Sequence, residues 1–213
     1  MNQIDQILHL KNVFSKEERQ FLIEEYENRS DNAHKEACIH ANTGLNTTST
    51  FTTVDLELNS ESYNLVFSKT EYMINQWIKH LESFKSFHIP ALKDFLKCSH
   101  KYRLMKYGEG GWIHPHIDGN PFVYASCTFQ LNEGFVGGDF WFWNGKHKVK
   151  LAAGDGLIFP AGPFWVHEVR NIHQGIRYSV NSFILASGQA LLEESHKLIE
   201  NSLKNIRTFD IDE

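Results

Sequence analysis

The sequence predicts an α+β fold, in which a jelly roll or sandwich of short β-strands is buttressed by N-terminal helices and followed by a C-terminal helix. Residues 1–98 contain amphipathic segments with helical spacing and a stretch of extended character. Residues 99–186 contain short apolar or alternating runs separated by Gly, Pro, Asn and Asp. The 213 residues suffice for one substantial core. We therefore expect a single domain, with helical and extended support at 1–98, a jelly-roll core at 99–186 and a C-terminal helix and tail at 187–213.

Composition narrows the class of protein. The sequence is 41% hydrophobic and 22% charged, which is typical of a globular protein. Its formal net charge of −5 lacks the basic excess of a general nucleic-acid binder, so no nucleic-acid partner is expected. Neither a membrane-spanning apolar run nor a signal peptide is visible. Three unclustered cysteines argue against a disulfide framework and against a thiolate zinc site, so we expect a reducing, cytoplasmic setting.

Helices are expected both before and after the strand region in the sequence. The residues from Ser15 to Glu18 have the spacing of a capping box and predict a helix to about Asn28, with Phe21, Leu22 and Tyr26 as its buried stripe. Extended structure is expected at 42–58, and a C-terminal helix at about 189–203. A longer helix is expected at about 60–84, with a packing stripe of Leu65, Val66, Met73, Ile74, Trp77, Ile78, Leu81 and Phe84.

Eight runs predict the strands of the core. They are bounded by turn-forming residues, and most alternate or are continuously apolar. They are Tyr102–Tyr107, Trp112–Ile117, Val123–Leu131, Asp139–Trp143, Lys148–Leu151, Gly156–Phe159, Trp165–Val169 and Ile176–Leu185.

Histidine and carboxylate residues alternate along the second of these strands. His114, His116 and Asp118 would point to one side of it, because side chains on a strand alternate with period 2. Residues four apart lie roughly 13 Å from each other, so His114 and Asp118 are poor co-ligands. The compact ligand pairs are therefore His116 with Asp118, or His114 with His116. Either motif alone is weak, because such short patterns arise often by chance.

The segment from His167 to Arg177 strengthens the metal hypothesis. A second imidazole, from a distant strand, would complete a site of two histidines and one carboxylate. Such a site leaves coordination positions open and suits non-haem Fe(II), which must also bind a cosubstrate and O₂. Arg177 then has a role as well, since a guanidinium binds a carboxylate through two parallel hydrogen bonds and stays charged when buried.

With these motifs in order, residues 100–186 resemble the prolyl 4-hydroxylase-like branch of the 2-oxoglutarate/Fe(II)-dependent oxygenases. Four ordered stretches carry the resemblance, and together they are far more specific than any one of them. They are the run from Tyr107 to Asp118, Leu131-Asn132 followed by Gly137-Gly138-Asp139-Phe140, the run from Ala153 to Pro160, and the run from His167 through Gly175 to Arg177.

The resemblance implies a double-stranded β-helix and the cofactors Fe(II), 2-oxoglutarate and O₂, with ascorbate as a further candidate. It implies hydroxylation of an unactivated C–H bond, in a prolyl or other amino-acyl residue or a small molecule, with release of succinate and CO₂. It also implies that His116, rather than His114, is the metal-binding partner of Asp118. The implied roles are His116, Asp118 and His167 as iron ligands, Arg177 on the C5 carboxylate of 2-oxoglutarate, Tyr107 as a hydrogen-bond partner of that cosubstrate, Gln130 and Asn181 as further polar pocket residues, and Phe140 in the cavity wall.

The sequence also departs from the family pattern and admits rivals. Val123 stands where some members carry an arginine, and residues 1–98 show no family signature, so the substrate stays open. One rival is a cupin-like metal enzyme that uses His114 and His116 without 2-oxoglutarate, although the nearest downstream glutamate, Glu133, is far from them. A second rival is a non-catalytic jelly-roll binding domain, which would show no iron-dependent turnover.

Overall fold

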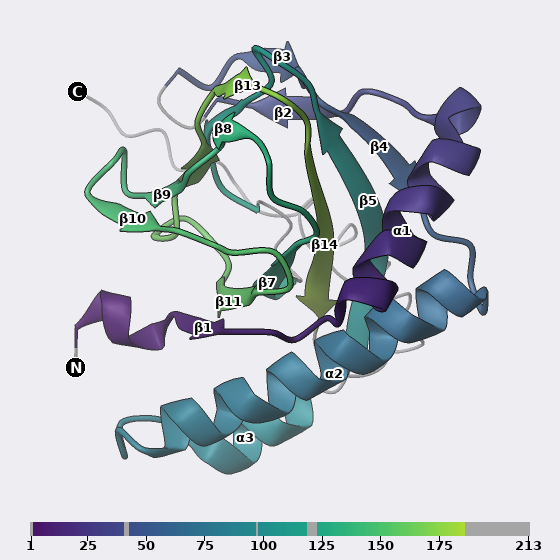
Figure 1. Cartoon of the computed structure of the whole chain (residues 1–213). Helices are drawn as coiled ribbons and strands as arrows, with labels where there is room; N and C mark the ends of the chain where they lie inside the picture. Colours follow the sequence, from purple (N-terminus) through teal and green to yellow (C-terminus); the bar gives the residue numbers. More distant parts are fainter. Residues whose placement is uncertain (1, 41–42, 97, 119–122, 186–213) are drawn as a thin grey trace, which may run out of the picture.

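The computed structural model describes residues 2–40, 43–96, 98–118 and 123–185 (Figure 1). Two β-sheets face each other and enclose an apolar core, and helices cover the outer face of the larger sheet. This arrangement confirms the predicted jelly roll with helical support. The larger, antiparallel sheet has the strand order β1 (Leu8–Leu10), β11 (Gly156–Pro160), β7 (Val123–Gln130), β14 (Arg177–Leu185), β5 (Cys98–Tyr107) and β4 (Thr52–Asp55).

The smaller sheet and two pairs of short antiparallel strands complete the barrel. The smaller sheet has the order β10 (His147–Val149), β9 (Phe140–Phe142), β12 (His167–Val169) and β6 (Ile113–His116). The pairs are β13 (Ile172–Gln174) with β8 (Val136–Gly137), and β2 (Ala37–Ile39) with β3 (Asn46–Thr48). All eight strands expected in the core are therefore present, with ends that differ by a few residues.

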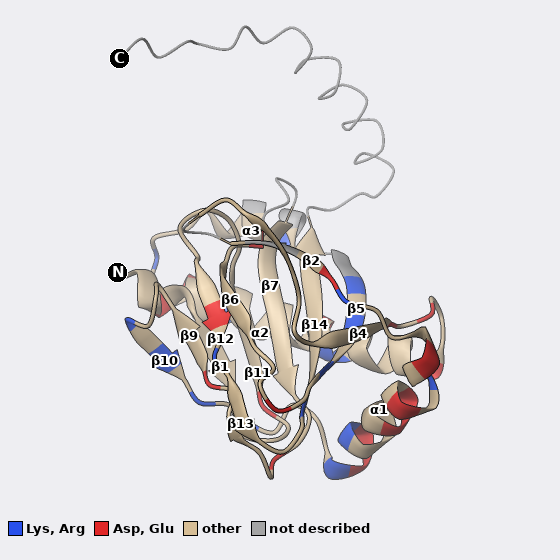
Figure 2. Cartoon of the chain, turned by 90° about the horizontal axis from the view of Figure 1, so that it is seen from above, with Lys and Arg blue, Asp and Glu red and all other residues tan. Residues whose placement is uncertain are grey.

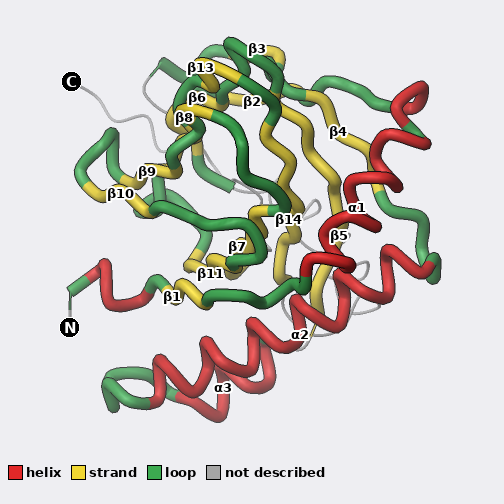
Figure 3. Tube along the Cα trace, in the orientation of Figure 1, coloured by secondary structure: helices red, strands yellow, loops and turns green. Residues whose placement is uncertain are grey.

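The two long helices begin where the sequence predicts. Helix α1 (Lys16–Asn28) opens with a capping box, in which the Ser15 hydroxyl accepts from the Glu18 backbone N–H at 3.2 Å and the Glu18 carboxylate accepts from the Ser15 N–H at 2.7 Å. Helix α2 (Glu61–Glu82) is capped by Ser60, whose hydroxyl accepts from the Tyr63 N–H at 3.1 Å. Figure 3 shows α1 and α2 on the same side of the strands.

Alternation along the strands creates two separate cores. Side chains of the outer face of the large sheet pack against the predicted helix stripes, and those of the inner face pack against the small sheet. The outer core includes Leu22, Met73, Trp77, Cys127, Phe129, Val180 and Ile184. The inner core includes Met105, Tyr107, Phe140, Phe142, Phe159 and Trp165.

Several short elements were not expected from the sequence. They are the helix α3 (Ile89–Phe95), the 3₁₀ turns η1 (Gln3–Gln6) and η2 (Ser30–Asn32), and the strands β1, β2, β8 and β13. Elements of two to seven residues are too short for a periodic signal, and tertiary contacts hold them instead. β1 is an example, because the His9 Nε2 lies 2.7 Å from the buried Asp155 carboxylate, next to β11. The predicted C-terminal helix at 189–203 lies outside the described residues.

Charge is distributed unevenly over the molecule. Figure 2 shows many charged residues along α1, whereas most strand positions in the two sheets are uncharged. Within the described ranges, no helix is both long and apolar enough to cross a membrane.

Candidate metal centre and cosubstrate pocket

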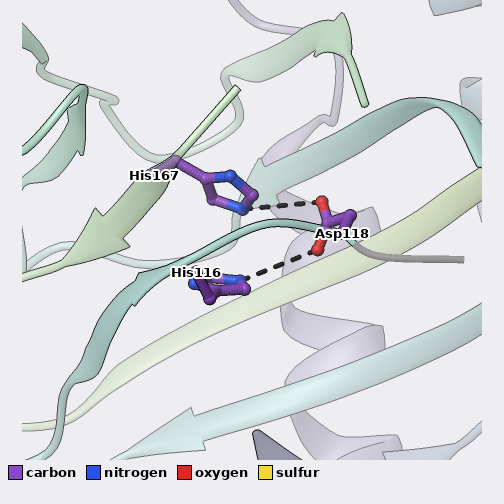
Figure 4. A group of neighbouring side chains, drawn as sticks. All are labelled: His116, Asp118 and His167. Carbon is purple, nitrogen blue, oxygen red and sulfur yellow. Dashed lines mark ion pairs between the residues drawn. The ribbon is translucent and has the colours of Figure 1, made fainter. Parts of the chain in front are cut away.

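Strands β6 and β12 bring two imidazole rings next to each other. The strands are antiparallel neighbours in the small sheet, and His116 is the register partner of His167. Their ring centroids lie 4.2 Å apart. Asp118 follows His116 by two residues, just beyond the end of β6, and turns its carboxylate toward both rings (Figure 4). His167 therefore meets two residues that lie at least 49 positions earlier in the chain.

The three side chains form a compact group of potential ligands. The Nε2 atom of His116 lies 3.6 Å from one carboxylate oxygen of Asp118, and the Nε2 atom of His167 lies 3.5 Å from the other (Figure 4). One ligand atom from each residue lies within 4.8 Å of the other two. This spacing is suitable for three donors that share one ion.

Hydrogen bonds orient each donor. The Nδ1 atom of His116 lies 3.0 Å from the carbonyl oxygen of His114, and that of His167 lies 2.9 Å from the carbonyl oxygen of Trp165. A carbonyl oxygen only accepts, so each Nδ1 carries the proton and each Nε2 presents a lone pair to the centre. The Ser126 hydroxyl donates to the Asp118 carboxylate.

The electrostatics suit a cation. Burial, reinforced by the neighbouring His167, lowers the pKa of His116 to about 4, so this imidazole is neutral at pH 7. Burial by itself would raise the pKa of Asp118. The two histidines and the Ser126 hydroxyl outweigh that effect and lower the pKa, so this carboxyl is ionised. A neutral imidazole and a carboxylate are the protonation states that an Fe(II) site requires, so these residues fit the metal.

His114 takes no part in this group. Its Nε2 lies 2.5 Å from the Thr47 hydroxyl, and its ring contacts those of His40 and Trp112, with centroids 4.8 and 4.7 Å away. The structure therefore brings together the His116–Asp118 pair and not the His114–His116 pair.

Arg177, the first residue of β14, is a buried cation. Its side chain is only 2% exposed, one terminal nitrogen donates to the Ser179 hydroxyl at 3.2 Å, and the guanidinium hydrogen-bonds with Tyr107 and lies 4.9 Å above that ring. Burial lowers its pKa, but from a value so high that the group stays charged. Its Nε is buried without a hydrogen-bond partner, and among the described residues no carboxylate pairs with it.

A cavity of about 520 Å³ lies next to this guanidinium. Residues 132–140 and 148–152 line it together with Gln130 and Arg177. Phe140 belongs to this wall, and its ring stacks on the His167 imidazole at a centroid distance of 5.4 Å with an interplanar angle of 12°. One aromatic ring therefore touches both the cavity and the ligand group.

The remaining pocket residues predicted from the sequence differ in their positions. Gln130 lines the cavity, but its side-chain amide donates to the carbonyl oxygens of Asn132 and Tyr178 at 3.1 and 3.0 Å and so fixes the adjoining loop. Tyr107 is buried and contacts Arg177, whereas Asn181 is half-buried on the same face of β14 as Arg177. Neither of these two lines the cavity, and their roles toward a cosubstrate stay predictions.

The paired glycines of the sequence motif have a steric reason. Gly138 has φ +68°, and a Cβ there would lie 2.5 Å from the Ile172 side chain and 3.0 Å from the Arg177 Cδ. At Gly137, with φ +89°, a Cβ would lie 2.1 Å from the Asn171 carbonyl oxygen. Only glycine allows the loop to pass this close to the arginine.

Two hydroxyl groups that the sequence reasoning passed over support the site. Ser126 on β7 donates a hydrogen bond to Asp118. Ser179 on β14 accepts a hydrogen bond from Arg177, which lies on the same strand, β14. Both are buried, and both alternate with outer-core residues along otherwise apolar strands. That placement of a small polar residue at every second position is the signal that could have identified them.

Comparison with known proteins agrees with this geometry. Residues 102–185 match the family model described as the 2OG-Fe(II) oxygenase superfamily. No curated protein matches the sequence significantly.

Solved structures with the same fold include several prolyl hydroxylases. A prolyl-4-hydroxylase from Pseudomonas putida aligns with a TM-score of 0.62 and 16% identity, over 86% of this chain and 94% of the other. The viral collagen prolyl hydroxylase from Paramecium bursaria Chlorella virus-1, in its 2OG complex, gives 0.60 and 15%, over 84% and 95%. A prolyl hydroxylase from Trichoplax adhaerens, in complex with a hypoxia inducible factor peptide fragment, gives 0.62 and 13%, over 85% and 84%.

Proposed function

We propose that this chain is a member of the 2OG-Fe(II) oxygenase superfamily, whose family model matches residues 102–185, and that it hydroxylates an unactivated C–H bond of an amino-acyl substrate. It is a 2-oxoglutarate-dependent dioxygenase, with Fe(II), 2-oxoglutarate and O₂ as the cofactors of its superfamily. In the proposed reaction, one oxygen atom of O₂ enters the substrate as a hydroxyl group and the other enters succinate, while 2-oxoglutarate loses CO₂.

One combined observation carries the proposal. Three ligand atoms converge next to Phe140, whose ring stacks on His167, and Phe140 also lines the cavity that contains a buried guanidinium without a carboxylate partner in the described part of the chain. A lone buried cation is costly unless an anion pairs with it. A dicarboxylate that reaches from a metal ion to the guanidinium satisfies both requirements.

Each residue then has a defined task. His116, Asp118 and His167 would hold Fe(II), which when bound couples the oxidative decarboxylation of 2-oxoglutarate to oxidation of the substrate. Arg177 would bind the C5 carboxylate of the cosubstrate in a bidentate fork, and Tyr107 would fix the plane of that guanidinium. The apolar inner core and Phe140 exclude water from the reacting atoms.

An amino-acyl substrate is supported by the neighbours in fold. The three solved structures are all prolyl hydroxylases, and the Trichoplax adhaerens protein is bound to a peptide. A peptide or a free amino acid is therefore the first substrate class to test.

The test is reconstitution of the purified protein with Fe(II) and 2-oxoglutarate without oxygen, followed by addition of O₂ and a panel of peptides and amino acids. We expect succinate release that depends on iron and 2-oxoglutarate and that rises with the correct substrate. A jelly roll that binds partners without catalysis would release no succinate under any of these conditions, and that result would refute the proposal.

A further inference from the structure

A second arginine, Arg103, lies on the inner face of the large sheet. On β5 it shares a face with Met105 and Tyr107, both of which belong to the inner core. Its register partner on β14 is Asn181, which pairs in turn with Thr128 on β7. Arg103 is therefore part of the wall that faces the small sheet and its metal ligands.

A chain of contacts links Arg103 to the metal centre. Ser126, which donates to the Asp118 carboxylate, is the register partner of Phe183 on β14. The guanidinium of Arg103 lies over the ring of Phe183, 4.5 Å from its centroid. Two strand spacings separate β5 from β7, which is roughly 10 Å across the sheet.

Arg103 is too far along the strands to duplicate the role of Arg177. The row that contains Arg177 and Tyr107 is four residues from the row that contains Asn181 and Arg103, roughly 13 Å along an extended strand. The cavity beside Arg177 is not lined by Arg103. The two arginines are thus far enough apart to bind two different carboxylates.

The guanidinium of Arg103 retains capacity to bind a ligand. One terminal nitrogen donates to the Glu36 carboxylate, next to β2, while Nε is buried without a hydrogen-bond partner. A guanidinium offers five N–H donors. The side chain is 14% exposed, so a group from solvent can reach it, and the surrounding burial strengthens any charge-assisted contact.

We propose that Arg103 binds a carboxylate group of the substrate and thereby positions the C–H bond that is hydroxylated. This assignment rests on the proposed function and specifies its substrate class, which is a carboxylate-bearing amino acid or peptide. The carboxylate belongs either to a free α-amino acid or to an acidic residue or C-terminus of a peptide. Both sources present the same planar anion to the guanidinium fork.

The test compares matched substrates in two arms, with succinate release above the substrate-free rate as the readout. One arm uses free L-amino acids and their α-carboxamides. The other uses peptides that contain Asp or Glu and the same peptides with Asn or Gln. For the wild-type enzyme we expect kcat/KM to favour the carboxylate by about 10- to 100-fold in one of the arms, the range of a charge-assisted hydrogen bond.

Variants assign that preference to Arg103. In Arg103→Gln the ratio should fall to about one, and Arg103→Lys should restore part of it. The matched control is Arg170→Gln. Like Arg103, Arg170 pairs with a glutamate, Glu168, and its guanidinium lies over an aromatic ring, that of Trp141, at 4.2 Å from the centroid. Unlike Arg103, its side chain is 49% exposed. The control should keep the full preference.

Four results would overturn the proposal. They are a wild-type enzyme that accepts carboxamides equally well, a wild-type enzyme that no carboxylate in either arm stimulates, an Arg103→Gln enzyme that keeps the preference, and an Arg103→Gln enzyme whose KM for 2-oxoglutarate rises when substrate is absent. The first two do not depend on whether the variant folds. Failure of the proposed function would give a different result, because the wild-type protein would then release no succinate either with or without substrate.

Discussion

The two faces of the large sheet differ in function: one packs against the helices and the other carries polar residues of the site. Strand β14 shows this difference within a single strand. Its outward side chains, Val180 and Ile184, are fully buried in the core that α1 and α2 cover. Its inward side chains include Arg177, which lines the cavity, and Ser179, which accepts a hydrogen bond from Arg177. A strand with period 2 can therefore stabilise the fold with one set of residues and position polar groups with the other.

The two faces of the large sheet also differ in the charge that they bury. Outer-face burial is almost wholly apolar and stabilises the fold. Its buried polar groups include Thr70 on α2 and Ser182 on β14, whose hydroxyl groups pair at 3.3 Å. The inner face buries, beside its apolar core, the guanidinium of Arg177, whose pKa is lowered by burial, and this desolvation costs stability until an anion pairs with the group. Substitutions on the outer face should therefore lower stability, and those on the inner face should lower ligand binding.

Among the substitutions considered, Asp118→Ala should show the largest loss of ligand binding relative to its loss of stability. Iron-dependent succinate release should fall by more than the roughly 100-fold that is typical when only a hydrogen-bond partner of a ligand is lost. The metal-free variant should melt only slightly below the wild type, because the two histidines and the Ser126 hydroxyl already offset the desolvation of this carboxylate, so that its net contribution to stability is small. Fe(II) binding and thermal melting measure the two quantities. Tight stoichiometric Fe(II) binding by Asp118→Ala would contradict the assignment.

Arg177→Leu tests the cosubstrate side of the inner face. Loss of a charge-assisted pair to a buried carboxylate is worth about 3 kcal/mol, so the KM for 2-oxoglutarate should rise roughly 100-fold. Arg177→Lys should recover part of the affinity, since it keeps the charge and loses the fork. Cosubstrate saturation that is unchanged in Arg177→Leu would show that the carboxylate binds elsewhere.

Ile184→Ala tests the outer face on the same strand. Removing this fully buried side chain should lower the free energy of unfolding by about 3 kcal/mol. The KM for 2-oxoglutarate, measured below the melting transition, should match the wild type. Denaturant unfolding and steady-state kinetics provide the two values. A change in KM without a loss of stability would break the division between the faces.

A smaller effect should appear in the pH dependence of the metal-free protein. The folded-state pKa of His116 is about 4, below the ordinary 6.5, so the unfolded state binds more protons between these values. Stability should therefore fall as pH drops from about 6.5 to about 4, by at most about 3 kcal/mol from this group. Asp118, with its lowered pKa, adds a loss below that window. His116→Asn should flatten the slope, and an unchanged slope would contradict the assigned pKa.

The sequence predicts those parts of the molecule that depend on local pattern. Periodicity indicates α1, α2 and the eight core strands, and the spacing from His167 to Arg177 indicates two ends of one site. Which of His114 and His116 pairs with Asp118 was left open by alternation alone and was indicated by the family resemblance. In the structure, His114 contacts Thr47 instead.

Features that depend on long-range register could not be predicted in this way. Ser126 and Arg103 are ordinary residues in their local sequence, and only the pairing of β5, β14 and β7 brings them to the metal ligands. The same holds for the strand β1, which pairs with β11 and is held by the contact between His9 and Asp155 across almost the whole chain. No window of neighbouring residues contains that information.

The most direct measurement is a crystal structure of the protein with Mn²⁺, a redox-inert substitute for Fe(II), and 2-oxoglutarate. One ion should lie between the Nε2 atoms of His116 and His167 and the carboxylate of Asp118, with the distal carboxylate of 2-oxoglutarate in the fork of Arg177. An ion bound through His114, or a cosubstrate that leaves Arg177 unpaired, would contradict the account.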